Sequence, residues 1–205
     1  MPILFQHTIN KDAQLSVWKI EEPETFFINA LPSISLPSHP HRRLQHLAGR
    51  YLLAYMQPDF SFEMIVSAQG NKPFVAGHSL EFSISHSSDI AAAIISKEKP
   101  VGIDVEHLSD KARRVAHKFL TDKEMALLKR DKESENDHCT LAWSIKETIF
   151  KWYGLGDVDF REDIQIRSLH TKDQENVAEC FFRKTDQVLD VNFIRLNNVV
   201  LSWLI

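Results

Sequence analysis

Residues 101–106 read VGIDVE, and this pattern predicts a short β-strand. Side chains alternate between the two faces of a strand, so the three apolar residues point one way and Asp104 and Glu106 point the other way. Two adjacent carboxylates repel each other unless a cation lies between them, and Mg²⁺ prefers oxygen ligands of this kind. Taken alone, the pair is more typical of a solvated strand face.

A second chemically unusual segment lies in a helix predicted over residues 139–153, which contains the sequence WSIKETIFK. Lysines and a glutamate on one helix face suit an anionic substrate, with the lysines as phosphate partners and the glutamate as a metal ligand or base. The alternative is an ordinary amphipathic helix with an i,i+4 ion pair. At 100° per residue, one face carries Trp143, Lys146, Glu147, Phe150 and Lys151.

A third segment, FSISHSS at residues 82–88, ends a predicted strand in small hydroxyl side chains around His86. This histidine could bind a phosphate group, or it could be a core histidine, because it has the same strand parity as Phe82 and Ile84. A serine hydrolase is less favoured, because the chain contains no Gly-x-Ser-x-Gly elbow. It also contains neither a Walker-type glycine loop nor a dinucleotide-binding glycine fingerprint.

Composition narrows the possible classes of protein. The 205 residues include 28 acidic and 24 basic side chains, which gives a net charge of -4 and argues against nucleic-acid binding. The longest apolar run, residues 90–95, is too short to span a membrane. Two cysteines and an N-terminus without the features of a secretory signal favour a cytoplasmic protein.

Both halves of the chain combine predicted strands with at least one long helix, which predicts the α+β class. The polar turn at residues 97–100 suggests a boundary and therefore two lobes, 1–98 and 99–205. Thr121 and Glu124 have the spacing of a capping box at a helix start. The other expected elements are a helix over residues 41–56 and strands over 62–68, 80–85, 90–96, 164–169, 179–182 and 199–205.

Three segments in this order resemble the 4'-phosphopantetheinyl transferases of the larger, two-lobed type: SHS at 85–87, VGIDVE at 101–106 and WSIKETIFK at 143–151. The family patterns are roughly (I/V)-G-(I/V)-D-(I/V)-E and W-x-x-K-E-(A/S)-x-x-K. Thr148 stands where the second pattern usually has a smaller residue. NKP at 71–73 resembles the GKP turn of the family, and HRRLQHLAGR at 41–50 resembles its first-lobe helix. The last 50 residues match no motif.

The resemblance implies a fold of two similar α+β lobes related by pseudo-twofold symmetry. It implies a Mg²⁺-dependent transferase that moves the 4'-phosphopantetheine arm of coenzyme A to a serine of an apo acyl or peptidyl carrier protein and releases 3',5'-ADP. It also implies a monomer, since one chain supplies both halves of a cleft that shorter relatives build between subunits. No membrane or nucleic-acid partner is expected.

The resemblance also assigns roles within the second lobe. Asp104, Glu106 and Glu147 are expected to hold Mg²⁺ on the pyrophosphate of coenzyme A. Glu147 is in addition the candidate base for the carrier serine, directly or through water. Lys146 and Lys151 are expected to act in catalysis and coenzyme A binding by neutralising phosphate charge.

Residues of the first lobe are expected to bind the nucleotide end of coenzyme A. His86, with Ser85 beside it, is expected to contact the 3'-phosphate or the pyrophosphate. Lys72, Arg43 and Arg50 are further candidates. The two arginines lie seven residues apart on one helix face, where the alternative is that both are merely solvated.

A local basic patch follows the predicted metal strand and is formed by Lys111, Arg113, Arg114 and Lys118. Because the chain itself is slightly acidic, docking of an acidic carrier protein would have to use a local patch of this kind or apolar contacts. The alternative is a solvated helix face.

Three other functions stay open at this point. The first is a Mg²⁺-dependent phosphoesterase or nucleotidyltransferase that uses the same carboxylates. The other two are a non-catalytic module that binds carrier proteins and a module that stores or senses coenzyme A. The intact set of acidic and lysine residues argues against a degenerate, non-catalytic relative.

Overall fold

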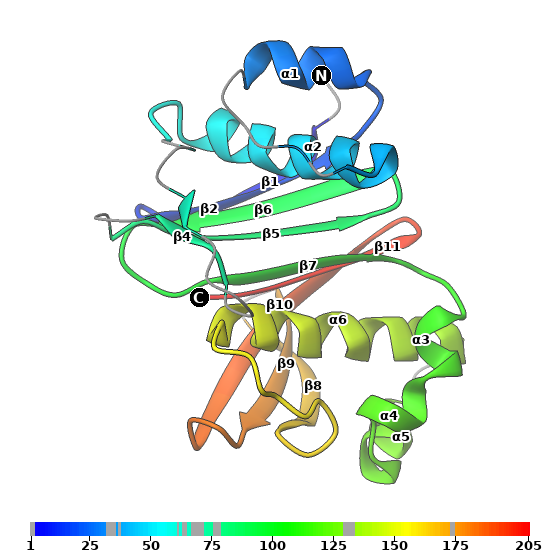
Figure 1. The fold of residues 1–205 in the computed structure, drawn as a ribbon. Coiled ribbons are helices and arrows are strands. Elements are labelled where there is room, and N and C mark those ends of the chain that lie inside the picture. Colours follow the sequence, from blue (N-terminus) through cyan, green and yellow to red (C-terminus); the bar gives the residue numbers. More distant parts are fainter. Residues whose placement is uncertain are drawn as a thin grey trace. The chain divides into compact units, whose positions relative to one another are not determined.

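The computed structural model describes residues 3–31, 36, 38–60, 62, 65–66, 72–75, 79–128, 134–172 and 175–205. The chain divides into two compact units, residues 1–103 with Ile205, and residues 104–204 (Figure 1). Each unit combines an antiparallel sheet with helices, so the predicted α+β class is confirmed. The pseudo-twofold symmetry and the lobe bounds 1–98 and 99–205 stay predictions.

The first unit contains a sheet with the strand order β1-β2-β6-β5. The strands are β1 (Ile3–Asn10), β2 (Ala13–Lys19), β5 (Glu81–Ser87) and β6 (Ile90–Ser96). Helices α1 (Glu24–Ala30) and α2 (Pro40–Met56) cover one face of this sheet (Figure 1). A separate pair is formed by β3 (Ile65–Val66) and β4 (Phe74–Val75). Much of the strand expected over residues 62–68 lies outside the described residues.

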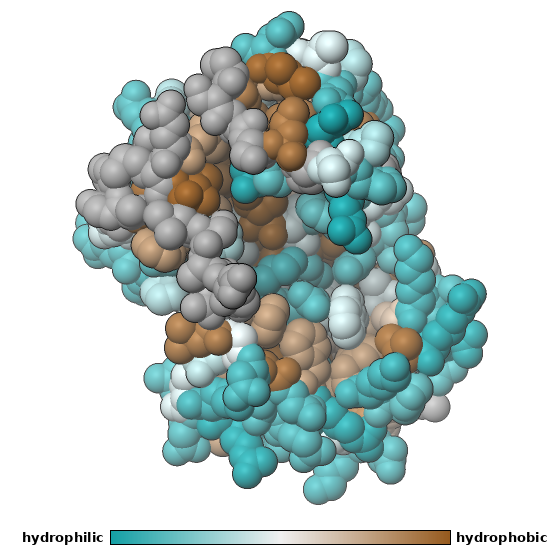
Figure 2. Space-filling view, in the orientation of Figure 1, coloured by the Kyte–Doolittle hydropathy of each residue, from teal (hydrophilic) through white to brown (hydrophobic). Residues whose placement is uncertain are grey.

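The interface between α2 and the sheet explains why this half of the sequence folds as it does. Leu47, Leu52 and Leu53 are fully buried, and so is Ala48, one helical turn before Leu52. A β-carbon on Gly49 would lie 2.5 Å from Cγ2 of Ile84, so only glycine allows this close approach of α2 to β5. Hydrophobic side chains near α1 stay visible at the surface in Figure 2, and Phe26 is 39% exposed.

The second unit contains a sheet with the strand order β7-β11-β10-β9-β8. These strands are β7 (Gly102–His107), β8 (Ile164–Lys172), β9 (Glu175–Phe182), β10 (Gln187–Leu196) and β11 (Val199–Leu204). The long helix α6 (Glu135–Tyr153) packs on this sheet. Three short helices precede it, α3 (Lys111–Arg114), α4 (Ala116–Phe119) and α5 (Asp122–Leu128).

Helix α6 has well-formed ends. Ser134 Oγ accepts a hydrogen bond from the backbone N–H of Asp137, which satisfies a free amide of the first turn. At the other end Gly154 adopts the left-handed conformation with φ 72°, which glycine accommodates without strain. The helix therefore begins four residues before the predicted Cys139 and ends where the sequence predicts.

Three buried hydroxyl groups join α6 to β11. Ser202 Oγ lies 2.7 Å from Ser144 Oγ and 2.7 Å from Thr148 Oγ1, and all three residues are 0% exposed. Thr148 Oγ1 also donates to the backbone carbonyl of Ser202 at 3.2 Å. The hydroxyl of Thr148 therefore has partners inside the core, which explains how this helix tolerates a polar side chain there.

Replacing Ser202 with alanine is expected to lower the free energy of unfolding by about 1–3 kcal/mol. The change removes the partner of Ser144 and leaves that buried hydroxyl unsatisfied, whereas Thr148 keeps the carbonyl of residue 202. Chemical denaturation of the parent and the variant measures the effect. The double change Ser144→Ala with Ser202→Ala is the control and should lose less than the sum of the two single changes. Additive losses would contradict a shared network.

Two further properties bear on the sequence predictions. Among the residues that the structure describes, no helix is long and apolar enough to cross a membrane. Cys139 and Cys180 are both buried free thiols. Burial raises the pKa of the Cys180 thiol, so this side chain is a poor nucleophile.

Candidate active site

Strand β7 carries the first two predicted site residues, Asp104 and Glu106. Both faces of this strand are covered near Asp104, because Ile103 and Val105 are 0% exposed and Asp104 is 2% exposed. Glu106 is half-buried. Asp104 therefore does not belong to a solvated strand face, which was the alternative explanation for this carboxylate.

Helix α6 brings Lys151 to Asp104. Lys151 Nζ donates to Asp104 Oδ1 at 2.6 Å, and the two side chains are 24% and 3% exposed. A buried carboxylate is costly without a cation beside it, so this ion pair joins β7 to α6 at the point where the two sequence motifs meet. The alternative for Lys151 was an i,i+4 ion pair with Glu147 inside the helix. Its ion pair with Asp104 instead reaches across to the strand.

Glu147 interacts electrostatically with the same groups. The pKa of its carboxyl is raised to about 7, and burial is the main cause. The ammonium of Lys151 acts in the opposite direction, while the negative charges of Asp104 and Glu106 raise the pKa further. Asp104, Glu106, Glu147 and Lys151 therefore form one electrostatically coupled cluster, which we call the acidic cluster.

The donor chemistry of the acidic cluster suits a hard divalent cation, because three carboxylates here share one ammonium. In the described part of the chain, however, no three histidine, cysteine or acidic side chains are arranged to hold a metal ion. Asp104 is instead held by Lys151. The three predicted ligands are thus neighbours in electrostatic terms, but they do not form a closed metal site in this arrangement.

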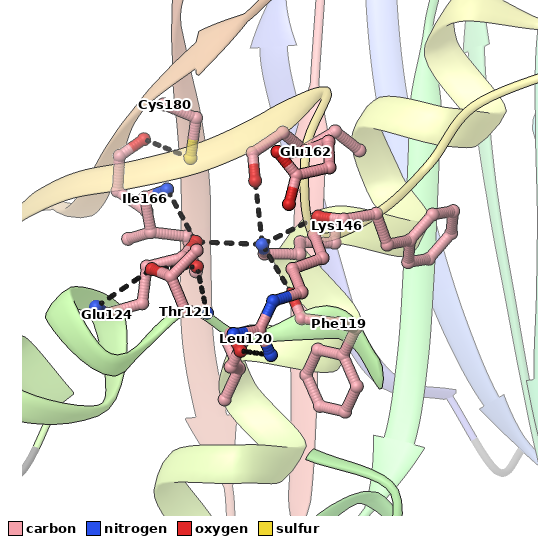
Figure 3. A network of polar contacts seen from close by, with 12 residues as sticks. Phe119, Leu120, Thr121, Glu124, Lys146, Glu162, Ile166 and Cys180 are labelled. Atoms are coloured by element: carbon pink, nitrogen blue, oxygen red, sulfur yellow. Dashed lines mark hydrogen bonds and ion pairs between the residues drawn. The ribbon is translucent and has the colours of Figure 1, made fainter. Parts of the chain in front are cut away.

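Lys146 is buried, which argues against the phosphate contact predicted for it. Its side chain is 0% exposed, and its Nζ lies 2.7 Å from Glu124 Oε1 (Figure 3). The same Nζ donates to the backbone carbonyls of residues 119, 160 and 164 at 2.6–2.8 Å. An ammonium has three donors, and these partners use all of them, so no donor is left for a phosphate group.

Glu124 is the partner that the sequence analysis did not include in the site. The capping box was its only sequence signal, and the structure contains that box: Glu124 Oε2 accepts from the backbone N–H and the hydroxyl of Thr121, both at 2.8 Å. Nothing in the spacing of Glu124 and Lys146, 22 residues apart, indicates that the two side chains meet.

The predicted coenzyme A ligands near β5 lie in the first unit. His86 is exposed, so it is not a core histidine, while its neighbour Ser85 is buried. Lys72 Nζ donates to the carbonyl of Val101 at 2.7 Å and lies 3.5 Å from Glu81 Oε2. Burial lowers the pKa of Lys72.

Arg43 and Arg50 both have protein partners on the helices of the first unit. Arg43 Nε lies 2.9 Å from Glu24 Oε1, which joins α2 to α1. Arg50 Nη1 lies 2.9 Å from His46 Nδ1 within α2. Neither is simply solvated, and each would have to exchange or share a contact to bind a nucleotide.

A cavity of about 230 Å³ lies beside the acidic cluster in the second unit. Its wall includes Glu106 and Lys111 together with the apolar side chains of Ala112, Val115 and Trp143. Trp143 lies on the same face of α6 as Glu147 and Lys151. The cavity therefore places apolar side chains directly next to one of the predicted metal ligands.

Comparison with known proteins agrees with the motifs. Residues 100–202 match the model of the 4'-phosphopantetheinyl transferase superfamily. This match includes β7 and α6, which carry the acidic cluster. The chain belongs to this superfamily.

Individual relatives carry the same description. The chain is 34% identical over 139 residues to 4'-phosphopantetheinyl transferase AcpT of Salmonella typhi, an alignment that covers 63% of this chain and 70% of the relative. It is 30% identical over 112 residues to enterobactin synthase component D of Escherichia coli (strain K12), with 54% of each chain covered. It is 33% identical over 76 residues to 4'-phosphopantetheinyl transferase Sfp of Bacillus subtilis (strain 168), covering 37% of this chain and 34% of the relative.

Proposed function

We propose that this chain transfers the 4'-phosphopantetheine arm of coenzyme A to a serine of an apo acyl or peptidyl carrier protein. The observation that carries the proposal is the acidic cluster, in which the two family motifs are joined by the ion pair between Lys151 and Asp104. In this reaction a bond forms between the serine oxygen and the β-phosphorus, the pyrophosphate bond breaks, and 3',5'-ADP leaves.

The residues of the acidic cluster divide the chemistry between them. Glu147 accepts the proton of the carrier serine, and a pKa of about 7 suits a base that acts near neutral pH. Lys151 stabilises negative charge on the phosphates. Mg²⁺ would be held by Asp104, Glu106 and Glu147 and would neutralise charge on the pyrophosphate.

The first unit supplies the contacts to the nucleotide in this proposal. His86 is the principal phosphate donor because its side chain is exposed at the end of β5. Ser85, Lys72, Arg43 and Arg50 have supporting roles. The protein acts as a monomer in the cytoplasm, where its two free thiols stay reduced.

The experiment that tests this function is incubation of the protein with coenzyme A, Mg²⁺ and several apo carrier proteins, followed by intact-mass measurement. We expect one carrier to gain the mass of a single phosphopantetheine arm and 3',5'-ADP to appear in equal amount. A phosphoesterase or nucleotidyltransferase would cleave coenzyme A without making the carrier heavier. Binding of coenzyme A without turnover would favour a storage or sensing module, and binding of carriers alone a non-catalytic module.

The basic patch on and after α3 is the proposed docking site for the carrier protein. Arg114 pairs with Asp110 at 2.7 Å, and Arg113 Nε donates to Asn136 at 2.8 Å. The remaining cations of the patch, Lys111 and Lys118, are exposed. The patch adjoins the cavity beside Glu106, because Lys111 belongs to both. An acidic carrier docked there would have its serine near the acidic cluster.

Charge reversal of Arg113 and Arg114 to glutamate is expected to raise the KM for the carrier protein by about tenfold, because long-range attraction becomes repulsion. The KM for coenzyme A should not change. Steady-state kinetics with each substrate varied in turn measures both constants. Reversal of Lys97 and Lys99, which are exposed in the first unit, changes the net charge equally and is the matched control. An equal rise in carrier KM for both double variants would contradict local docking.

A further inference from the structure

Lys146 lies at the centre of a buried polar network that holds α6 against two other segments (Figure 3). Its Nζ binds the carbonyl of Phe119 at 2.7 Å, at the end of α4. On the other side it binds the carbonyls of Phe160 at 2.8 Å and Ile164 at 2.6 Å, just before and at the start of β8. One ammonium group from α6 therefore contacts backbone on two sides.

Glu124 completes this network from α5. Its Oε1 contacts Lys146 Nζ at 2.7 Å and also accepts the backbone N–H of Ile166 at 3.0 Å. Its other oxygen is held by Thr121. Both charged side chains are buried, Lys146 at 0% and Glu124 at 3% exposed, and every partner is at hydrogen-bond distance. Each polar atom of the two charged side chains therefore has defined partners within the network.

Arg161 ties the same two segments together near the surface. Its Nη1 donates to the carbonyls of His117 at 2.5 Å and Leu120 at 2.7 Å. Residues 117–124 and 159–166 are therefore connected independently of α6. Lys146 attaches α6 to these two segments, which are already connected to each other. Its contacts therefore act mainly on the position of the helix.

The position of Lys146 in the sequence gives these contacts a consequence for the acidic cluster. Glu147 is the next residue, turned by about 100° around the helix axis, and Lys151 follows just over one turn later. A shift of α6 by one residue would move Lys146 Nζ by about 1.5 Å along the axis and rotate it away from its acceptors. The buried contacts of Lys146 therefore set both the axial position and the rotation of the helix that carries Glu147 and Lys151.

We infer that Lys146, together with Glu124, is a positioning residue of the active site: its buried contacts hold α6 in the register that places Glu147 and Lys151 at Asp104. This inference rests on the proposed function. It differs from a purely structural role, because an uncharged pair of similar volume at these positions would restore part of the stability without fixing the register. It also explains why a lysine of the second motif is buried.

The test compares Lys146→Met, Glu124→Gln and the double variant with the parent. Melting temperature, kcat and the two KM values are measured, with all assays well below each melting temperature. Lys146→Met should be the least stable because it leaves the Glu124 carboxylate buried without a cation. The double variant should regain part of the melting temperature, since neither charge remains. Its kcat should nevertheless stay about 10- to 100-fold below that of the parent, with the KM for coenzyme A changed less than threefold.

A matched control separates misplacement from general instability. Val191→Ala removes two buried carbon atoms from β10, far from the network in sequence, and should lower the melting temperature with kcat within about twofold of the parent. If kcat of the double variant recovers together with its melting temperature, the inference is overturned. If Lys146→Met fails to fold, Glu124→Gln and the double variant decide in the same way.

Failure of all three to fold would assign the pair a purely structural role and would also overturn the inference. A parent protein that modifies no carrier overturns the proposed function and this inference with it. An active parent whose variants are equally active overturns the inference alone.

Discussion

Replacement of Asp104 by alanine is expected to lower the rate of carrier modification by about 10³-fold while the fold survives. The carboxylate is 3% exposed and is the partner of Lys151, so its loss removes the group that joins β7 to α6. Lys151 is 24% exposed and can turn to solvent, which limits the cost to stability. Intact-mass kinetics measures the activity, and circular dichroism with a melting curve measures the fold.

Asp104→Asn sharpens this prediction because it keeps the shape of the side chain and removes only its charge. It should be impaired nearly as much as the alanine variant. Asp157→Ala is the control, since that exposed carboxylate pairs with Lys184 and is not part of the acidic cluster, and it should keep parental activity. Turnover close to that of the parent for Asp104→Ala, at saturating Mg²⁺, would refute the assignment of Asp104 to the site.

Replacement of Glu124 by alanine is expected to lower the free energy of unfolding by about 3–5 kcal/mol. The change leaves the ammonium of Lys146 fully buried with only carbonyl partners, and it removes the acceptor for the backbone N–H groups of Thr121 and Ile166. Burial already lowers the pKa of Lys146, and Glu124 is the main group that opposes this shift. In the variant the lysine should therefore lose its proton more readily.

Urea denaturation followed by circular dichroism measures the loss, provided that the slope of the transition is unchanged. Asp163→Ala is a useful comparison, because Asp163 also accepts a backbone N–H, from Asp159, but its ion pair with Lys184 at 3.5 Å is near the surface. It should cost about 1–2 kcal/mol. A loss below that value for Glu124→Ala would mean that the buried pair contributes little to stability.

The sequence was sufficient to predict the local elements that carry the chemistry. Alternation in residues 101–106 predicts β7, and the apolar spacing around Trp143 predicts α6. The family resemblance added the assignment of both segments to one site, and the electrostatic interaction of Glu147 with Asp104 and Glu106 agrees with that assignment. The roles of the individual residues in binding metal and coenzyme A stay predictions.

What could not be predicted depends on contacts between segments that are distant in sequence. The helical wheel groups Lys146 with Lys151 and Glu147, but the helix face is wide. Lys146 at its edge meets Glu124, whereas Lys151 meets Asp104. Likewise, parity alone left His86 as a possible core residue, although it is exposed near the end of β5. Strand order and the partner of a buried charge are set by tertiary packing, which local periodicity does not contain.

The buried hydroxyl cluster beneath α6 has a consequence for how homologous sequences can vary. Thr148 occupies a position where the second motif usually has a smaller residue, and its hydroxyl is satisfied by Ser202 on β11. An alanine at position 148 would no longer donate to the oxygens of residue 202, and an apolar side chain at 202 would leave the hydroxyl at 148 with only the backbone carbonyl of residue 202. Evolutionary covariation between these two positions, 54 residues apart, is therefore expected in an alignment of the family.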